Sequence, residues 1–346
     1  MNTDEIRGKV RIAPTYDGAV HGASMRDTVR CLHAIAAAAP EVGLVPCGVG
    51  GSSLEIAPVD ADPPRLEAAA PIEGDGLAVR MVPGEIVAGF AAFLDGIQTS
   101  KPAAYVRSGV PVVHGTVAAV IRVRTARTLR TWHGAPIVER KLYAPVGLVG
   151  VELVDLFHAA GLTLVDTLDG MAATGARHPQ ELLALARTAV QRAREQAELT
   201  LAEAWCSSEQ RPLYIDGGIS GSGTAAKSAC AVGIVKSHRT LYATSGAVGV
   251  VTSLPIGSRS TAFEIRSPRR TTVASWYLRL RDPAGRDPLF GLVRVEIARG
   301  AFTVAHADLV SRWILAERAP LSLPDKRWST MAYGIRDCEE YLRATA

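Results

Sequence analysis

Short apolar runs, separated by polar and glycine-containing segments, recur along the middle and the C-terminal part of the chain. Several are rich in Val and Ile, and some alternate apolar with polar positions, as half-buried strands do. On this pattern we expect strands over residues 110–124, 137–143, 231–235, 275–280 and 292–297. A sheet of several strands is therefore the first element that the pattern predicts.

Other stretches have apolar residues at helical spacing. The longest begins at Pro179 and extends to about Trp205. In it Leu182, Leu185, Ala186, Ala189, Ala193, Ala197 and Leu201 recur on one face. We also expect helices over 24–38, 307–318 and 328–344, and a short one near 225–229. Strands and helices together predict an α/β fold.

Two of the apolar runs end in the same dipeptide. Residues 86–94 lead into Asp95 and Gly96, and residues 212–215 lead into Asp216 and Gly217. Because Gly tolerates the backbone of a strand end, each Asp is expected at the mouth of a sheet. The alternative is that each Asp-Gly is an ordinary turn. A further Asp-Gly, at 169–170, falls in a stretch whose structure the pattern leaves ambiguous.

The order of elements carries more information than any one of them. A strand with a terminal Asp is followed by further strands, a long helix, a second strand with a terminal Asp and C-terminal helices. This order matches the RNase H-like fold, a mixed central sheet flanked by helices. We expect that domain over residues 86–346, with an additional N-terminal region of helix and loop over 1–85.

Nucleases of this fold collect carboxylates for two-metal hydrolysis of phosphodiesters, and Mg²⁺ or Mn²⁺ prefers oxygen ligands. Asp95 and Asp216 are the first candidates as catalytic and metal-binding residues. The long helix adds Glu198, at the border of its apolar face, with Glu195 as the next choice. The alternative for the helix is that its glutamates are only solvated.

Several segments resemble the NurA nucleases. The resemblance covers residues 86–346, and its specificity lies in the order and spacing of short motifs. Those motifs are FLDG at 93–96, Arg194 with Glu198, LYIDG at 213–217, AVGIVKS at 231–237, YLRL at 277–280 and VRVEI at 293–297. The resemblance implies a metal-dependent deoxyribonuclease that works as a homodimer with a HerA-type hexameric ATPase in DNA end processing or phage defence.

The chain departs from this family near its C-terminus. Where the family has a His that assists the metal site, this chain has Tyr333, and Asp337 follows four residues later on the same helical face. Both are auxiliary candidates. Either the site works with three carboxylates, or the protein is a catalytically weakened DNA-binding or assembly subunit.

Charge permits a polyanionic partner without requiring one. The formal net charge is +4, and arginines recur in two segments. We expect Arg122, Arg124 and Arg279 to contact phosphates, with solvated strand faces as the alternative. Lys236, directly after an apolar strand, could steady a phosphate beside Asp216.

Compartment follows from what the sequence lacks. The five cysteines are widely spaced with no C-x-x-C pair, which favours a reducing cytoplasm over a disulfide framework. The first residues resemble no secretory signal, and no apolar run is long enough to span a membrane.

The sequence thus leaves three hypotheses for function. The first is the metal-dependent nuclease, and the second is the DNA-binding or assembly subunit without catalysis. The third is an unrelated α/β enzyme in which both Asp-Gly pairs are turns.

Overall fold

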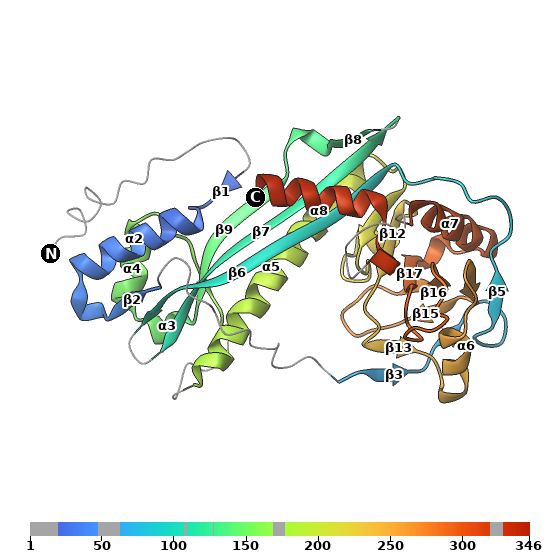
Figure 1. Cartoon of the computed structure of the whole chain (residues 1–346), viewed down its shortest axis with the longest axis horizontal. Coiled ribbons are helices and arrows are strands. Elements are labelled where there is room, and N and C mark those ends of the chain that lie inside the picture. The colour runs from blue at the N-terminus through green and yellow to red at the C-terminus, as the bar shows by residue number, and fades with distance from the viewer. Residues whose placement is uncertain (1–19, 48–62, 107–108, 127, 169–176, 319–327) are drawn as a thin grey trace.

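A computed structural model describes residues 20–47, 63–106, 109–126, 128–168, 177–318 and 328–346 (Figure 1). Long strands cross the centre, a long helix follows them on one side, and the C-terminal helix lies on the other. No helix in the described part of the chain has both the length and the apolar character that crossing a membrane requires.

Five strands form the centre of the sheet, in the order β9-β7-β6-β11-β12. They are β6 (Ala92–Val106), β7 (Val110–Thr125), β9 (Ile137–Ala144), β11 (Leu213–Asp216) and β12 (Ala231–Val235). The pairs β6–β7 and β7–β9 are antiparallel, whereas β6–β11 and β11–β12 are parallel. In chain order this is 3-2-1-4-5, the RNase H-like arrangement, and the predicted fold class is confirmed.

An antiparallel extension continues the sheet beyond β12. It consists of β17 (Leu292–Ala298) and then β16 (Val273–Arg279), and β14 (Ser258–Ser260) and β15 (Phe263–Ile265) pair with β16. Shorter strands attach elsewhere: β8 (Thr128–Thr131) to β7, and β10 (Leu164–Asp166) to β9. A separate pair joins β3 (Arg65–Glu67) to β13 (Thr240–Tyr242).

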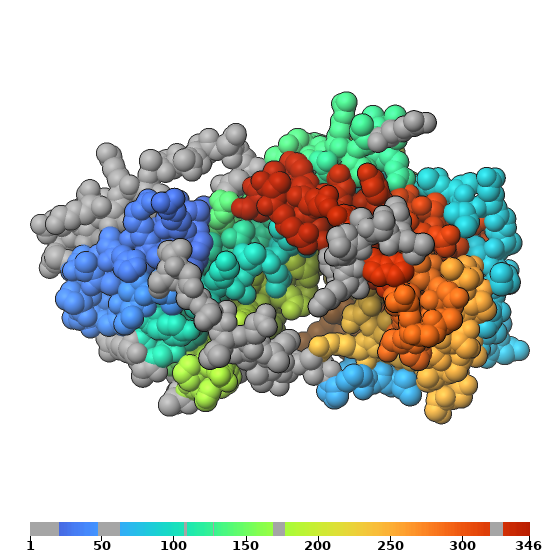
Figure 2. All heavy atoms as spheres, viewed as in Figure 1, coloured from blue at the N-terminus to red at the C-terminus, as the bar shows by residue number. Residues whose placement is uncertain are grey.

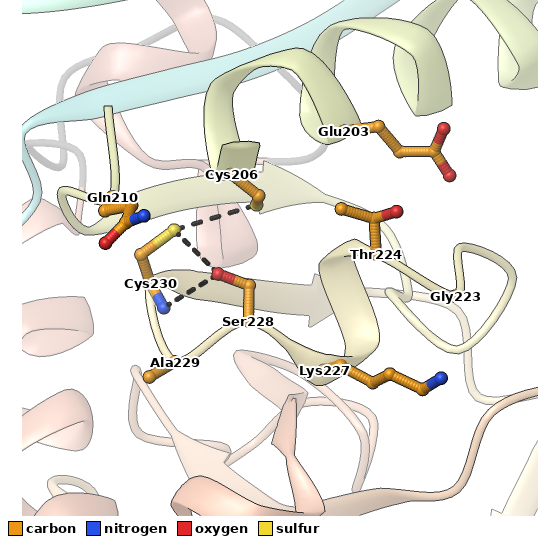
Figure 3. A pocket seen from close by; sticks show the side chains of 9 residues that line it. All are labelled: Glu203, Cys206, Gln210, Gly223, Thr224, Lys227, Ser228, Ala229 and Cys230. Carbon is orange, nitrogen blue, oxygen red and sulfur yellow. Dashed lines mark hydrogen bonds between the residues drawn. The ribbon is translucent and has the colours of Figure 1, made fainter. Parts of the chain in front are cut away.

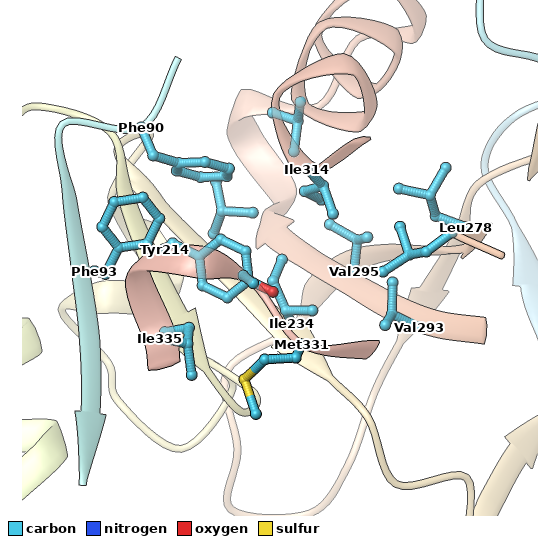
Figure 4. Packing of buried hydrophobic residues seen from close by; sticks show 14 of the residues in the cluster. Phe90, Phe93, Tyr214, Ile234, Leu278, Val293, Val295, Ile314, Met331 and Ile335 are labelled. Carbon is cyan, nitrogen blue, oxygen red and sulfur yellow. The ribbon is translucent and has the colours of Figure 1, made fainter. Parts of the chain in front are cut away.

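Helices cover both faces of the central sheet because β6 and β11 alternate their side chains between two apolar layers. Leu94 and Ile215 pack with Trp205 of α5 (Pro179–Ser208). Phe93 and Tyr214 face the opposite layer, which holds α7 (Val304–Glu317) and α8 (Tyr333–Thr345) (Figure 4). In the space-filling view α8 lies across the front, between the end built by N-terminal residues and the end that holds α7 (Figure 2).

The described residues of the N-terminal region are joined to the main sheet. The predicted helix is present as α2 (Met25–Ala38), with the Ser24 side chain accepting from the backbone N–H of Asp27. Strands β1 (Val20–His21) and β2 (Leu44–Pro46) pair with β9 and β6. Strands β4 (Ala70–Pro71) and β5 (Val79–Met81) pair with β15 and β14. The region is therefore more than helix and loop, although a domain boundary at residue 85 stays a prediction.

The remaining helices lie at the two ends of the molecule (Figure 1). Helices α3 (Val146–Val149) and α4 (Val151–Ala159) pack near α2, and α6 (Val248–Thr252) lies at the opposite end. The predicted short helix near 225–229 is a 3₁₀ turn, Ala225–Lys227. The helix predicted over 328–344 is divided into a 3₁₀ turn, Trp328–Thr330, and α8.

One strand differs clearly from its prediction. The strand expected over 86–94 begins at Ala92 and does not end at Asp95, but continues through Gly96 to Val106. Gly96 keeps its place in the ladder opposite Ala119 of β7. The first Asp-Gly is therefore inside a strand, and the second is at the end of β11, where Gly217 has a φ of 133°. The Asp-Gly at 169–170 lies outside the described residues.

Candidate active site

Asp95 and Asp216 lie on adjacent parallel strands. The register pairs Tyr214 with Phe93 and Ile215 with Leu94, and the two aspartates follow these last paired residues. Strand β11 ends here while β6 continues, paired with β7, so the aspartates lie where β11 and β6 separate. The two strands that carry the aspartates are thus direct neighbours, and the expectation that both aspartates end a strand holds only for Asp216.

Glu198 approaches this point from α5, and Gly96 makes room for it. A Cβ added at residue 96 would lie 2.5 Å from Oε1 of Glu198 and 3.0 Å from the carbonyl oxygen of Ala118. No side chain other than hydrogen fits between the strand and the glutamate without a shift. The sequence Asp95-Gly96 thus serves close packing of a helix carboxylate on the sheet, a role different from the turn that the dipeptide usually indicates.

Basic side chains neutralise two of the three carboxylates. Nζ of Lys236, which follows β12, lies 2.7 Å from Oδ2 of Asp216. Arg194, one turn before Glu198 on α5, forms an ion pair with Oε1 of Glu198. The same guanidinium donates through Nε to Oε1 of Gln98 on β6, at 3.1 Å, and so ties the helix to the strand.

Asp95 has the least compensated charge of the three. Its side chain is buried, Oδ1 accepts from the backbone N–H of Gly96 at 2.8 Å, and Oδ2 has no partner among the described residues. Burial raises the pKa of Asp95 well above its ordinary value, and the negative charge of Asp216 raises it further, against the opposing effect of Lys236. A buried, orphaned carboxylate oxygen is a group that a cation would satisfy.

Glu198 is also shifted. Burial raises the pKa of Glu198 to about 7, against the opposing charge and hydrogen bond of Arg194. Asp216 and Glu195 add smaller repulsive contributions. Carboxylates that are buried near one another are disfavoured as anions, and this is the electrostatic situation of a site built for a cation.

The structure adds a carboxylate that the sequence analysis did not single out. Glu339 of α8 is buried and lies 2.9 Å from Nη2 of Arg343. Its charge also contributes to the raised pKa of Asp95, after burial and the nearer charges. The signal was weak in the sequence, because Glu339 is one of two consecutive glutamates on an amphipathic helix and only packing distinguishes them.

A second buried glutamate holds the loop after Asp216. Glu296 of β17 accepts from the backbone N–H of Ile219 through Oε2 at 2.8 Å, and Nη1 of Arg294 donates to its Oε1 at 2.6 Å. The same Oε2 would lie 2.9 Å from a Cβ at Gly218. The Arg-Val-Glu motif at 294–296 therefore has a structural task here, which is to fix the chain that leaves Asp216.

Glu195, Tyr333 and Asp337, the auxiliary candidates apart from Lys236, are largely exposed or paired with other side chains. The Glu195 side chain is 49% exposed, and its Oε1 accepts from Gln191 at 2.9 Å. Tyr333 begins α8 and is 61% exposed. Asp337 forms an ion pair with Arg122, at 2.6 Å between Oδ1 and Nε. On α8, Glu339 rather than Asp337 is among the charges that act on Asp95.

The three arginines expected at phosphates are all used within the protein. Arg122 bonds Asp337 and Thr131, and its guanidinium lies over the ring of Tyr341. Arg124 pairs in a bidentate manner with the buried Glu317, with both distances 2.7 Å. Arg279 is fully buried and, among the described residues, donates to the backbone carbonyls of Val251, Thr252, Leu254, Pro288 and Phe290. Their positions do not favour contact with a phosphate.

The chemical type of the donor atoms at this site suits a hard divalent cation. The site offers carboxylate oxygens, one of them buried without a partner among the described residues, and a glycine that lets a helix glutamate come close. Within the described part of the chain, however, no three Asp, Glu, His or Cys side chains are already grouped as a ligand set. Ligation would require Lys236 and Arg194 to release or share the oxygens that they now bind.

Comparison with known proteins gives a distant fold neighbour. No family model matches the chain, and no curated protein sequence matches it. Among solved structures the chain is similar to the crystal structure of the NurA nuclease from Sulfolobus solfataricus. The TM-score is 0.43 at 11% sequence identity, over 79% of this chain and 81% of the other. A likeness this distant assigns no role to any residue of this chain.

Proposed function

We propose that this protein is a metal-dependent deoxyribonuclease, with Asp95, Glu198 and Asp216 as its catalytic and metal-binding residues. The observation that carries the proposal is the convergence of three elements at one point of the sheet. Asp95 and Asp216 follow paired positions of adjacent parallel strands, and Gly96 admits Glu198 from α5. These carboxylates are far apart in the sequence, and burial makes the charges of Asp95 and Glu198 costly without a cation.

Mn²⁺ or Mg²⁺ is the cofactor that this donor chemistry favours. When bound, such ions activate a water molecule and stabilise the leaving oxygen of a phosphodiester. The buried Oδ2 of Asp95 would gain the partner that it lacks among the described residues. Glu296 would keep Asp216 in position by holding Ile219.

Lys236 is the cation that we assign to phosphate contact. Its Nζ lies 2.7 Å from Asp216, and its side chain is 19% exposed, so the ammonium is beside the carboxylates and still reachable. An ammonium on a flexible stem can exchange a carboxylate for a phosphate oxygen. Arg122, Arg124 and Arg279 are already engaged within the protein and are not needed for this role.

Partners are proposed from the sequence resemblance alone. They are DNA, a second copy of the chain, and a HerA-type hexameric ATPase. Analytical ultracentrifugation of the purified protein tests the dimer, and co-purification from cells that express both proteins tests the ATPase. A monomer with no ATPase bound would leave a nuclease that works by itself.

The proposed activity is tested by incubating labelled linear DNA with the purified chain in Mn²⁺ or in EDTA. Cleavage in Mn²⁺ that EDTA abolishes, and that Asp95→Asn and Asp216→Asn each remove, is the expected result. Cleavage that survives either substitution would remove that residue from the site.

A second candidate is a DNA-binding or assembly subunit without catalysis. The observation that favours it is the pairing of Asp216 and Glu198 with Lys236 and Arg194, which satisfies both carboxylates with no metal. Buried ion pairs can be structural by themselves. This candidate predicts DNA binding with no cleavage, and no stabilisation of the fold by Mn²⁺.

A further inference from the structure

A pocket of about 680 Å³ opens beside the C-terminal end of α5, and two cysteines line it (Figure 3). Asp95, Glu198 and Asp216 are not among its lining residues. Its other lining residues are mostly small or polar, namely Glu203, Gln210, Gly223, Thr224, Lys227, Ser228 and Ala229. Cys206 comes from α5, and Cys230 comes from the segment just before β12. A small polar molecule can therefore reach two thiols from the same pocket.

The two sulfur atoms are close. Sγ of Cys206 and Sγ of Cys230 lie 3.6 Å apart and share a hydrogen bond, whereas a disulfide requires about 2.05 Å. Both residues are fixed by the fold. Cys206 is on the last turns of a long helix, and the carbonyl of Cys230 accepts from the backbone N–H of Leu213 at 2.9 Å. A disulfide between Cys206 and Cys230 would therefore require a small movement of the two side chains and no rearrangement of the strands.

The surroundings distinguish Cys230 from the other cysteines. Its sulfur lies 3.1 Å from Oγ of Ser228. The hydrogen bond with Cys206 lowers the pKa of Cys230, and Ser228 lowers it further, against the opposing effect of burial. Burial instead raises the pKa of Cys31 to about 11 and that of Cys47 above its ordinary value. A thiolate is the reactive form of cysteine, so Cys230 is the best nucleophile of this set.

We propose that Cys206 and Cys230 form a peroxide-reactive thiol pair that closes to a reversible disulfide. The Cys230 thiolate attacks one oxygen of a hydroperoxide, the O–O bond breaks, and hydroxide leaves as Cys230 becomes a sulfenic acid. Cys206 then attacks that sulfur, the S–S bond forms, the S–O bond breaks, and water leaves. With hydrogen peroxide, the two thiols lose two electrons and one peroxide becomes two waters.

This bond would join elements that also carry the carboxylate site. Cys206 is on the same helix as Glu198, and Cys230 immediately precedes the strand that leads to Lys236. Oxidation would therefore tie the helix to the strand. The chemistry itself does not depend on the proposed nuclease activity, and the two proposals can fail separately.

The test is a peptide map of the full chain after treatment with hydrogen peroxide, without reducing agent. Because Pro212 protects the bond after Arg211, trypsin places the two cysteines on separate peptides, 195–227 and 228–236, and a disulfide appears as a linked pair. We expect this linked pair to form with peroxide and to disappear with dithiothreitol. We also expect Cys206→Ser to accumulate a sulfenic acid at Cys230, trapped by dimedone at least about tenfold more than at Cys47.

Cys31→Ser is the matched control, because Cys31 is buried on α2 and does not line the pocket. It should leave the linked peptide unchanged, whereas Cys230→Ser should abolish it. The proposal is overturned if peroxide gives no linked peptide in the wild-type chain. It is equally overturned if dimedone labels Cys47 in the Cys206→Ser variant and leaves Cys230 unlabelled.

Discussion

Gly96 and Glu198 are separated by about a hundred residues of chain and meet across the interface between β6 and α5. A Cβ at residue 96 would lie 2.5 Å from Oε1 of Glu198, closer than a real Cβ contact. Gly96 remains in the strand ladder and does not have the positive φ that Gly217 has. Its contribution to the site is therefore space, which lets a carboxylate from the helix reach the sheet beside Asp95.

Gly96→Ala tests this relationship. The added methyl group must displace Glu198 or push α5 away from the sheet, and overpacking of this kind costs about 1–3 kcal/mol of unfolding free energy. We expect that loss in urea denaturation, together with weaker Mn²⁺-dependent DNA cleavage. Gly76→Ala is the control, because a Cβ there meets nothing within 4 Å. Equal stability of the two variants would show that the packing of Glu198 against β6 does not require a glycine at residue 96.

Asp216→Asn should abolish cleavage and keep the fold. A neutral amide has nearly the same shape, but it cannot supply the charge that holds a hard cation. In metalloenzymes, mutation of a residue that only hydrogen-bonds to a metal ligand lowers metal affinity or activity about 10–100-fold. For a direct ligand we therefore expect the cleavage rate to fall by more than about 100-fold. Asp75→Asn is the matched control, an exposed aspartate that is also followed by glycine. Wild-type cleavage by Asp216→Asn, measured on labelled DNA, would contradict this role.

The two Asp-Gly pairs show how far the sequence alone could lead. Apolar runs before Asp95 and Asp216 indicated two strands, and the order of elements indicated the RNase H-like fold class, which agrees with the observed strand order. The sequence could not show that Gly96 continues a strand and Gly217 ends one. Gly96 is paired with Ala119 of β7, whereas β11 ends at Asp216, and these pairings exist only in the folded chain.

The arginines show what the sequence alone could not predict. In the sequence Arg124 and Arg279 belong to arginine-rich segments, which are typical of a solvated or phosphate-binding face. In the structure both arginines bind partners within the protein. Glu317, which binds Arg124, is 193 residues away in the chain. Pairing over such distances leaves no local pattern. Glu339 and Glu296 have ion partners nearby in the chain, Arg343 and Arg294, but their burial is decided by packing in the fold.

Arg124→Ala separates a structural role from DNA contact. It would leave Glu317, whose side chain is 4% exposed, buried without its bidentate partner. Breaking a buried pair costs about 3–5 kcal/mol, and the 26% exposure of Arg124 places our expectation nearer about 2–3 kcal/mol. Arg30→Ala, which breaks an exposed pair with Asp27, should stay within about 0.5 kcal/mol. Unchanged stability with weakened DNA binding would instead support phosphate contact by Arg124.

The raised pKa of Glu198 predicts how stability depends on pH when no metal is bound. Its folded pKa of about 7 exceeds the ordinary value of 4.5, so the folded state holds the proton more tightly. The protonated Glu198 therefore contributes to the unfolding free energy below pH 4.5, and this contribution is lost as the pH rises to about 7. In EDTA we expect the unfolding free energy to fall by roughly 1–3 kcal/mol over this interval.

Glu198→Gln should flatten this pH dependence, because the amide does not titrate. The groups that act on Glu198 are Arg194 and Glu195 from its own helix and Asp216 from β11, and all three remain in the variant. Denaturant titrations at several pH values measure the slope. The assignment fails if the variant keeps the full wild-type slope.

The most direct measurement is an X-ray structure of the protein crystallised or soaked with Mn²⁺, with the anomalous signal used to locate the ion. Mn²⁺ is identified by its own scattering, so the result depends on no assay of activity. We predict an anomalous peak between Asp95 and Asp216, with an oxygen of Glu198 among the ligands and the Lys236 ammonium moved away from Asp216. A structure at saturating Mn²⁺ with no peak there, and with Lys236 still bound to Asp216, would contradict the metal site and the nuclease function that depends on it.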